Sequence, residues 1–501
     1  MLLLGIDLGT SFIKISVVDA ASQLLLASAT WPDTEAAIST PQPGWAEQHP
    51  DQWWIDVKHA ITKCHASRKY DPAAIGAIGI SYQMHGLVLT DRQQQAIRPS
   101  IIWCDSRAVD TGEKAFEGLG QEYCLHHLLN SPGNFTIAKL AWVKENEPAV
   151  YSRIHQFMLP GDFIALKLTG ESTMTVSGLS EGVCWDFQQQ RISAELLDYY
   201  GLDQQMIPPV RPLFGMHGQV TKETAVVLSL RAGIPVTYKA GDQLNNALAL
   251  HVLQPGEVAA TAGTSGVIYA VTDTLDYDPF SRVNSFAHVN YTPQQPRIGV
   301  LLCINGAGIF NRWIKQIAAH DPGYAGLNQL AASVPAGAEG LLALPFGNGA
   351  ERMLGNQLPG AAFADIDLNK HGLPQMVRAV QEGIAFAFRY GMDIMRENGM
   401  ELKLVRAAKA NLFLSDVFSA SFAAVNNTAI EFYEGDGSYG AALGAGIGVG
   451  YYKDAQEAGQ NRTPSAMLEP VPSAGLEDAY QRWKSFLKKS IHAGEVTMSL
   501  S

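Results

Sequence analysis

The strongest constraint on the fold is a hairpin pattern that occurs twice, half the chain apart. Residues 2–19 have the sequence LLLGIDLGTSFIKISVVD, an apolar strand followed by a glycine-containing turn and an alternating strand. Residues 262–269, AGTSGVIY, repeat the turn and the outgoing strand. The offset between Thr10 and Thr264 is 264 − 10 = 254 positions, about half of the 501 residues. The repeat predicts a duplicated fold of two lobes.

Both turns carry groups that suit phosphate binding. Glycine lets the backbone approach a ligand, and backbone N–H and side-chain O–H groups donate to phosphate oxygens. These residues are Gly9, Thr10 and Ser11 in the first copy and Gly263, Thr264 and Ser265 in the second. Asp7 precedes only the first turn, because Thr261 takes its place in the second copy, so we expect magnesium on the first side only. For one hairpin taken alone, an ordinary turn with a polar tip is an equal alternative.

The composition restricts the partners of the chain. A length of 501 residues predicts two or three domains, and a hydrophobic content of 47% indicates a globular protein with large cores. The net charge of −12 argues against nucleic acid or an anionic membrane as a partner, because both need clustered Lys and Arg. Five scattered cysteines without a CxxC pair predict reduced thiols. With no signal-peptide pattern at the start, we expect a cytoplasmic location.

Polar side chains follow three predicted buried strands, at the ends where open α/β sheets bind ligands. The predicted strands are 75–80, 101–103 and 234–238. The side chains are Gln83, Met84 and His85 after the first, Trp103, Asp105 and Arg107 at the second, and Asp242 and Gln243 after the third. Each set has a structural alternative: core packing for the first, an ion pair for the second, and a helix N-cap for the third.

Taken together, these motifs resemble the FGGY family of carbohydrate kinases, within the ATPase superfamily of actin, hexokinase and the sugar kinases. The similarity rests on the two hairpins and on QMHG (83–86), WCDSR (103–107) and AGDQ (240–243), which are nearest to xylulokinases. It extends from residue 1 to about 455 and is looser in the second half. The resemblance implies an α/β fold of two ribonuclease-H-like lobes with a cleft between them. Residues 1–243 would carry the sugar site, and residues 244–501 the nucleotide site and a C-terminal helical extension.

The resemblance also implies roles for individual residues. Asp242 would be the general base, and Asp7 would be the catalytic acid group that holds Mg²⁺. Sugar contacts are implied for Gln83, Met84, His85, Trp103, Asp105, Arg107 and Gln243. Contacts with ATP are implied for Gly9, Thr10, Ser11, Lys14, Gly263, Thr264, Ser265, Gly308, Ala408, Lys409 and Asn411. For Lys14 the alternative is a solvated side chain, which is the usual state of lysine on a strand face.

Two segments depart from the family pattern. After the predicted strand 402–405 the family has a Gly-Gly turn at the nucleotide, whereas this chain has Ala407 and Ala408. Each alanine adds a Cβ and disfavours positive φ, so we expect a narrowed site and weak ATP affinity. The family also has acidic residues near positions 174–180, and this chain has none there.

The expected reaction is therefore ATP- and Mg²⁺-dependent phosphorylation of a primary hydroxyl of a small ketose, D-xylulose first. Another pentulose or a polyol, such as ribulose or a glycerol-like substrate, is an alternative. A second class stays open, a sugar- or nucleotide-binding relative with little turnover, which Ala407 and Ala408 favour and the intact Asp7 and Asp242 disfavour. The expected partner is a small sugar, with neither nucleic acid nor membrane, and a homodimer is the oligomeric state to test.

Overall fold

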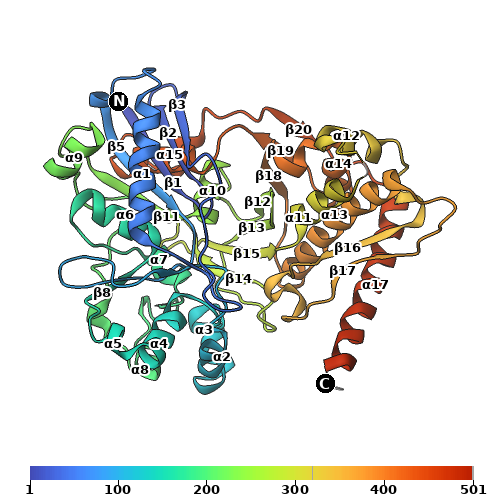
Figure 1. The fold of residues 1–501 in the computed structure, drawn as a ribbon, viewed down its shortest axis with the longest axis horizontal. Helices are drawn as coiled ribbons and strands as arrows, with labels where there is room; N and C mark the ends of the chain where they lie inside the picture. The colour runs from blue at the N-terminus through green and yellow to red at the C-terminus, as the bar shows by residue number, and fades with distance from the viewer. Residues whose placement is uncertain (319, 499–501) are drawn as a thin grey trace.

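Both predicted hairpins form, and each lies in the middle of its own sheet. The computed structural model of the protein describes residues 1–318 and 320–498. The first hairpin joins β1 (Leu2–Leu8) to β2 (Ile13–Asp19), and the second joins β12 (Glu257–Ala262) to β13 (Gly266–Thr272). Their sheets belong to two α/β lobes that lie side by side (Figure 1).

The two sheets repeat one strand order, which confirms the predicted duplication. The first sheet contains β11 (Val236–Gly241), β5 (Ile75–Tyr82), β1, β2 and β3 (Leu25–Trp31) in that order. In the second sheet, the matching strands are β19 (Ile430–Tyr433), β18 (Leu404–Ala408), β12, β13 and β15 (Ile298–Ile304), with β20 (Ala466–Leu468) and β14 (Asn284–Ala287) at the edges. In both sheets, three antiparallel strands continue into two parallel strands.

Helices from both halves of the chain cover the first sheet. One face packs against α1 (Pro50–His65). The helical spacing of apolar residues in this segment predicts a buried stripe, and its members are all buried: Trp53, Val57, Ala60, Ile61 and Cys64. The other face packs against α15 (Gly437–Gly448), although this helix follows β19 of the second lobe (Figure 1). The contact is so close that a Cβ at Gly5 would collide with the carbonyl oxygen of Ser438. The division of the chain at residue 243 stays a prediction.

The second lobe is covered by α11 (Ala307–Ile317), α12 (Gly323–Ala332), α13 (Leu373–Glu397), α14 (Asp416–Asn426) and α17 (Ala474–Met498). The amphipathic pattern of residues 476–487 predicts a helix that packs back on the protein, and in α17 Tyr480, Trp483 and Leu487 are buried. The indole N–H of Trp483 donates to the carbonyl oxygen of Ala343 at 2.8 Å. Ala343 belongs to β16 (Leu342–Phe346), which pairs with β17 (Gly360–Ala364).

Smaller elements lie mostly around the first sheet, with α10 (Asp242–Ala249) where the chain passes to the second lobe (Figure 1). The other helices are α2 (Val109–Gly118), α3 (Gln121–Leu128), α4 (Thr136–Asn146), α5 (Pro148–Tyr151), α6 (Pro160–Thr169), α7 (Val176–Glu181), α8 (Ala194–Tyr200), α9 (Lys222–Leu228) and α16 (Ala455–Gly459). The short strands are β4 (Glu47–Gln48), β6 (Val88–Thr90), β7 (Ser100–Ile101), β8 (Gln156–Met158), β9 (Trp185–Asp186) and β10 (Arg191–Ile192).

Two further observations concern the cysteines and the helices of the described residues. No disulfide joins the five cysteines within them. None of the helices in this part of the chain combines the length and the apolar content that crossing a bilayer requires.

Candidate active site

Two carboxylates, Asp7 and Asp242, lie at one edge of the first sheet. β1 and β11 both run parallel to β5, one on each side, and Leu8 and Gly241 are both in register with Tyr82. Asp7 precedes Leu8 and Asp242 follows Gly241, so both side chains belong to the carboxyl edge of the sheet, where ligands bind. Gly241 occupies the N-cap position of α10, and Asp242 is the first residue of the helix. The N-cap alternative for Asp242 is therefore wrong.

The two carboxylates repel each other electrostatically. Burial raises the pKa of Asp242 to about 7, and the carboxylate of Asp7 adds to the rise, while hydrogen bonds from Gln243 oppose it. Burial also raises the pKa of Asp7, and the nearby ammonium group of Lys14 lowers it. A carboxyl group with a pKa near 7 is well suited to accept a proton at neutral pH.

The start of α15 closes the site around Asp7. A Cβ on Gly437 would lie 2.5 Å from an oxygen of Asp7, so this carboxylate lies directly against the first residue of α15. Lys14 faces Asp7 across the β1–β2 pair, and its Nζ is 3.9 Å from Oδ2 of Asp436, which caps α15. The first hairpin site therefore contains groups from both ends of the chain.

A polar network holds the first turn in place. Thr10 Oγ1 accepts from Trp103 Nε1 and donates to Gln83 Oε1, both at 3.0 Å. The amide nitrogen of Gln83 donates to Gln48 Oε1 at 3.0 Å, and that of Gln48 donates to the Thr10 carbonyl oxygen at 2.8 Å. Gln83 is buried, which favours a supporting role under the turn over direct sugar contact. Trp103 is 37% exposed and remains a candidate sugar contact.

His85 presents a neutral imidazole to the site. Its ring lies 4.8 Å from the ring of Phe135 and 5.3 Å from that of Phe286. Nδ1 is 2.9 Å from the main-chain oxygen of Glu181 and must donate its proton, because a carbonyl oxygen only accepts. Burial lowers the pKa of His85 to about 3, so Nε2 is left as an acceptor for a hydroxyl. Met84 is buried beside Gly241, as the packing alternative predicted.

Asp105 and Arg107 form a buried ion pair. The guanidinium NH2 of Arg107 is 2.7 Å from Asp105 Oδ2, and the two side chains are 1% and 0% exposed. Arg107 also lies over the ring of Trp45 at 3.7 Å and pairs with Glu47 at 2.8 Å. Every charged group here already has a partner, which favours the structural alternative over direct sugar contact.

The second turn gathers the predicted nucleotide residues. Thr264 is exposed and Ser265 is half-buried, and the carbonyl oxygen of Thr264 accepts from the N–H of Ile309 in α11 at 3.2 Å. A Cβ at Gly308 would collide with the carbonyl oxygen of Gly263, so this approach requires glycine. The amide of Asn411 lies beside Gly263 on the other side. Gly263, Thr264, Ser265, Gly308 and Asn411 therefore converge.

The second turn differs from the first in having Thr261 instead of a carboxylate before it. Thr261 occupies the position of Asp7 in the second copy, and its hydroxyl accepts from the amide of Asn246 in α10 at 3.2 Å. Asn245, the residue before Asn246, donates to the carbonyl oxygen of Gly437 at 2.7 Å. α10 thus connects the second hairpin to the start of α15.

Ala407 and Ala408 avoid the positive φ that alanine disfavours, so the backbone is not strained at them, and the narrowed site with weak ATP affinity stays a prediction. Both alanines are the last residues of β18 and neither has positive φ. The left-handed residue of the turn is Asn411, with φ of 54°, and asparagine tolerates this conformation well. The side chain of Ala407 is fully buried, so only the half-buried Ala408 can approach a nucleotide. Lys409 lies with its Nζ 4.5 Å from the ring centre of Phe432.

We therefore expect Ala408→Gly to leave the KM for ATP within about threefold of the wild-type value, because no strain is relieved and glycine alone costs about 0.5–1 kcal/mol of ordering. Steady-state kinetics at saturating sugar measures this, with Ala410→Gly in the same turn as the matched control. A tenfold tighter ATP interaction in Ala408→Gly alone would show that the methyl group crowds the nucleotide.

Sequence reasoning missed two buried ionisable residues beside the turn that contains His85. Glu181 ends α7 and Lys139 lies in α4, and both side chains are fully buried. Glu181 is the single acid in the segment VSGLSEGV (176–183) and lies one residue after positions 174–180, where the family has acidic residues. Lys139 is the single lysine among the apolar residues 137–141.

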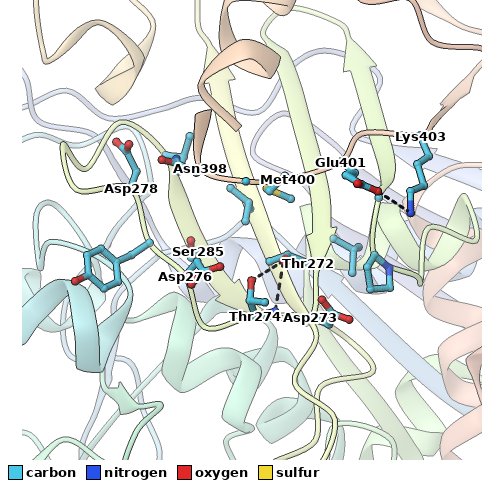
Figure 2. Close-up of a pocket in the computed structure, with 17 residues that line it drawn as sticks. Thr272, Asp273, Thr274, Asp276, Asp278, Ser285, Asn398, Met400, Glu401 and Lys403 are labelled. Carbon is cyan, nitrogen blue, oxygen red and sulfur yellow. Dashed lines mark hydrogen bonds and ion pairs between the residues drawn. The ribbon is translucent and has the colours of Figure 1, made fainter. Parts of the chain in front are cut away.

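One cavity lies away from these groups. It has a volume of about 300 Å³ and lies at the end of β13 remote from the hairpin turn (Figure 2). Its lining includes Thr272, Asp273, Ser285, Asn398 and Lys403, none of which is a predicted site residue. A second cavity, of about 240 Å³, is lined by Ile309, Phe310 and Trp313 of α11 and lies closer to the second turn.

The chemistry of the first hairpin fits a divalent cation. The carboxylate of Asp436 raises the pKa of Asp7, the carboxylate of Asp7 raises the pKa of Asp242, and Lys14 is the cation that lowers the pKa of Asp7. Added nucleotide phosphates would increase this excess of negative charge. No cluster of three or more His, Cys, Asp or Glu occurs in the described residues. A magnesium ion here would therefore be held by Asp7 together with phosphate oxygens and water, as is usual for this ion.

Comparison with known proteins gives a consistent result. Residues 2–249 match the N-terminal domain of the FGGY family of carbohydrate kinases, and residues 258–444 match its C-terminal domain. The xylulose kinase of Escherichia coli strain K12 is 27% identical over 448 residues, which cover 88% of each chain. A solved structure named xyloylose kinase, from Brucella ovis, has a TM-score of 0.88 at 28% identity and covers 98% of this chain and 100% of its own. The xylulose kinase from Rhodospirillum rubrum has a TM-score of 0.85 at 25% identity, with 98% and 99% covered.

Proposed function

The chain belongs to the FGGY family of carbohydrate kinases, and we propose that it transfers the γ-phosphoryl group of ATP to a primary hydroxyl of D-xylulose, which gives D-xylulose 5-phosphate. The names of the relatives suggest this sugar. The observation that carries the mechanism is Asp242, whose pKa near 7 and position beside Asp7 suit a general base.

In this proposal the sugar lies between His85, Trp103 and Asp242. An alcohol is a poor nucleophile at neutral pH, so a group that accepts its proton lowers the barrier. Asp242 takes the proton of the reacting hydroxyl at a carboxylate oxygen. Nε2 of His85 accepts a hydrogen bond from a second hydroxyl and so orients the sugar. Gln243, next to Asp242 and half-buried, is the third candidate contact.

The phosphates lie between the two turns. Backbone N–H and hydroxyl groups of Gly9, Thr10 and Ser11 on one side and of Gly263, Thr264 and Ser265 on the other donate to phosphate oxygens. Asp7 would hold Mg²⁺, which neutralises charge on the phosphates when bound. Lys14 adds one positive charge at the same place, and its side chain is 40% exposed.

Release of ADP from ATP and Mg²⁺ with a panel of sugars tests this proposal. We expect D-xylulose to give the highest kcat/KM, with ribulose, other pentuloses, gluconate and glycerol in the panel. If another sugar of the panel gave the highest activity, the proposed kinase reaction would stand and the proposed substrate would change. No sugar-dependent ADP release with any member would support the alternative, a binding relative without efficient turnover.

The pH dependence of the reaction follows from Asp242. The base must be ionised to accept a proton, and its pKa is about 7, so kcat/KM for the sugar should fall about tenfold for each pH unit below that value and level off above it. Direct quantification of ADP avoids coupling enzymes with their own pH dependence. A flat profile of kcat/KM between pH 5.5 and 8 would contradict the role of Asp242.

A further inference from the structure

The buried carboxyl group of Glu181 touches both the sugar turn and the base turn. Its Oε1 accepts from the backbone N–H of His85 at 3.2 Å, and its Oε2 accepts from the hydroxyl of Tyr82 at 3.4 Å. A Cβ at Gly241 would lie 2.6 Å from the same Oε2, so the carboxyl group packs directly against the residue before Asp242. Its main-chain oxygen also accepts from Nδ1 of His85 at 2.9 Å.

We propose that Glu181 is a positioning residue that fixes Asp242 relative to the sugar bound at His85. This inference rests on the proposed function and goes beyond it, because it assigns a role to a residue that contacts neither the sugar nor the phosphates. Through Glu181, the end of α7 controls the distance between His85, which binds the sugar, and Asp242, which takes its proton.

The conformation of His85 shows why such a support is needed. Its φ of 61° lies in the left-handed region, which is sparsely populated for residues other than glycine. Glu181 binds both the N–H and the ring of this residue. Without an acceptor, that buried N–H would lose its hydrogen bond, and the turn would relax toward other conformations. Gly241 has no side chain, so a shift of the carboxyl group is transmitted directly to the backbone of Asp242.

Glu181 acts here through hydrogen bonds and contact. Burial raises the pKa of Glu181 well above its usual range, and the carboxylates of Asp162 and Asp242 raise it further. Glutamine has the same shape and keeps an oxygen that can accept from the N–H of His85, so it is the matched replacement. Methionine has a similar volume but no acceptor for the N–H of His85.

Lys139 provides a comparison on the other side of the same turn. Its Nζ donates to the carbonyl oxygens of His85 at 2.9 Å and Ile102 at 3.0 Å. It supports the sugar turns in this way, and no hydrogen bond joins it to Gly241 or Asp242 in the described residues. Loss of Lys139 should therefore affect sugar binding more than the proton transfer.

Steady-state kinetics of Glu181→Met, Glu181→Gln and Lys139→Met tests the proposal, with Mg·ATP and the sugar that the wild-type protein turns over best. In Glu181→Met we expect kcat to fall at least about tenfold and the sugar KM to rise, with an unchanged KM for ATP. In Glu181→Gln, kcat and the sugar KM should stay within about threefold of wild type. In Lys139→Met the sugar KM should rise more than kcat falls.

Two outcomes would overturn the proposal. One is a natively folded Glu181→Met, by near-UV circular dichroism, with wild-type kcat and sugar KM. The other is a Glu181→Gln variant as impaired as Glu181→Met. If Glu181→Met does not fold, Glu181→Gln decides alone, since loss of its kcat in a folded protein contradicts the hydrogen-bonding role. Absence of turnover in the wild-type protein is a separate result and counts against the proposed function.

Discussion

Asp242→Asn is expected to lower kcat by roughly 10²- to 10⁴-fold, the usual scale for the loss of a general base. Asparagine has the same shape and can keep the hydrogen bonds with Gln243, but it cannot take the proton of the sugar hydroxyl. The substitution also removes one of the two charges that repel each other at this edge of the sheet. Binding of sugar and of Mg·ATP should therefore be retained or slightly strengthened while turnover is lost.

Separate measurements of turnover and of binding check this expectation. Single-turnover kinetics gives the chemical step, and calorimetric titration gives the two affinities. Asp273→Asn is the matched control, because Asp273 has the position of Asp19 in the repeat and lines the remote cavity of Figure 2. It should leave both quantities unchanged. Turnover near the wild-type rate in Asp242→Asn would remove this residue from the mechanism.

The fold could be predicted from the sequence as far as local patterns determine it. The duplicated hairpins, the stripe of α1 and the amphipathic α17 all follow from periodicity and turn chemistry, and they are confirmed. The position of α15 could not be predicted in this way. Its small residues indicate close packing, but periodicity does not tell which sheet they face, and this helix crosses to the first lobe.

Helix starts show the same limit on a smaller scale. The sequence predicts that Asp162 caps a helix that begins at residue 163. In the structure α6 begins at Pro160, and Asp162 reaches back from its first turn to the N–H of Leu159 at 3.1 Å. The other oxygen of Asp162 pairs with Lys239, which lies 77 positions away in the sequence. A local pattern contains no information on such a partner.

The sequence was most informative about the candidate site where polar residues lie at the ends of predicted strands. Asp7 and Asp242 both lie at the carboxyl edge of the first sheet, and their catalytic roles stay proposals. Gln83, Asp105 and Arg107 illustrate the opposite case, because polar residue types in a motif do not reveal that other protein groups already satisfy them. Glu181 was missed because its proposed role depends on contacts with turns about 60 and 100 positions away.

Lys239→Met is expected to destabilise the first lobe by about 3–5 kcal/mol, the usual cost of breaking a buried ion pair. Lys239 lies in β11, three residues before Asp242, and its side chain is fully buried. Its ammonium group donates to Asp162 Oδ1 at 2.6 Å and to the carbonyl and hydroxyl oxygens of Thr173 at 2.7 and 2.9 Å. Methionine fills the space but leaves the carboxylate of Asp162 buried without its partner. Urea denaturation followed by tryptophan fluorescence measures the loss in the first unfolding transition.

Lys63→Met is the matched control, because its ion pair with Asp33 has nearly the same length, 2.7 Å, but its side chains are 46% and 77% exposed. Solvent screens this pair, so its loss should cost less than about 1 kcal/mol. The contrast between two pairs of nearly equal length tests the effect of burial. Equal shifts in the two variants would mean that Asp162 becomes protonated or hydrated at little cost, and that the pair does not hold β11 and its catalytic end in place.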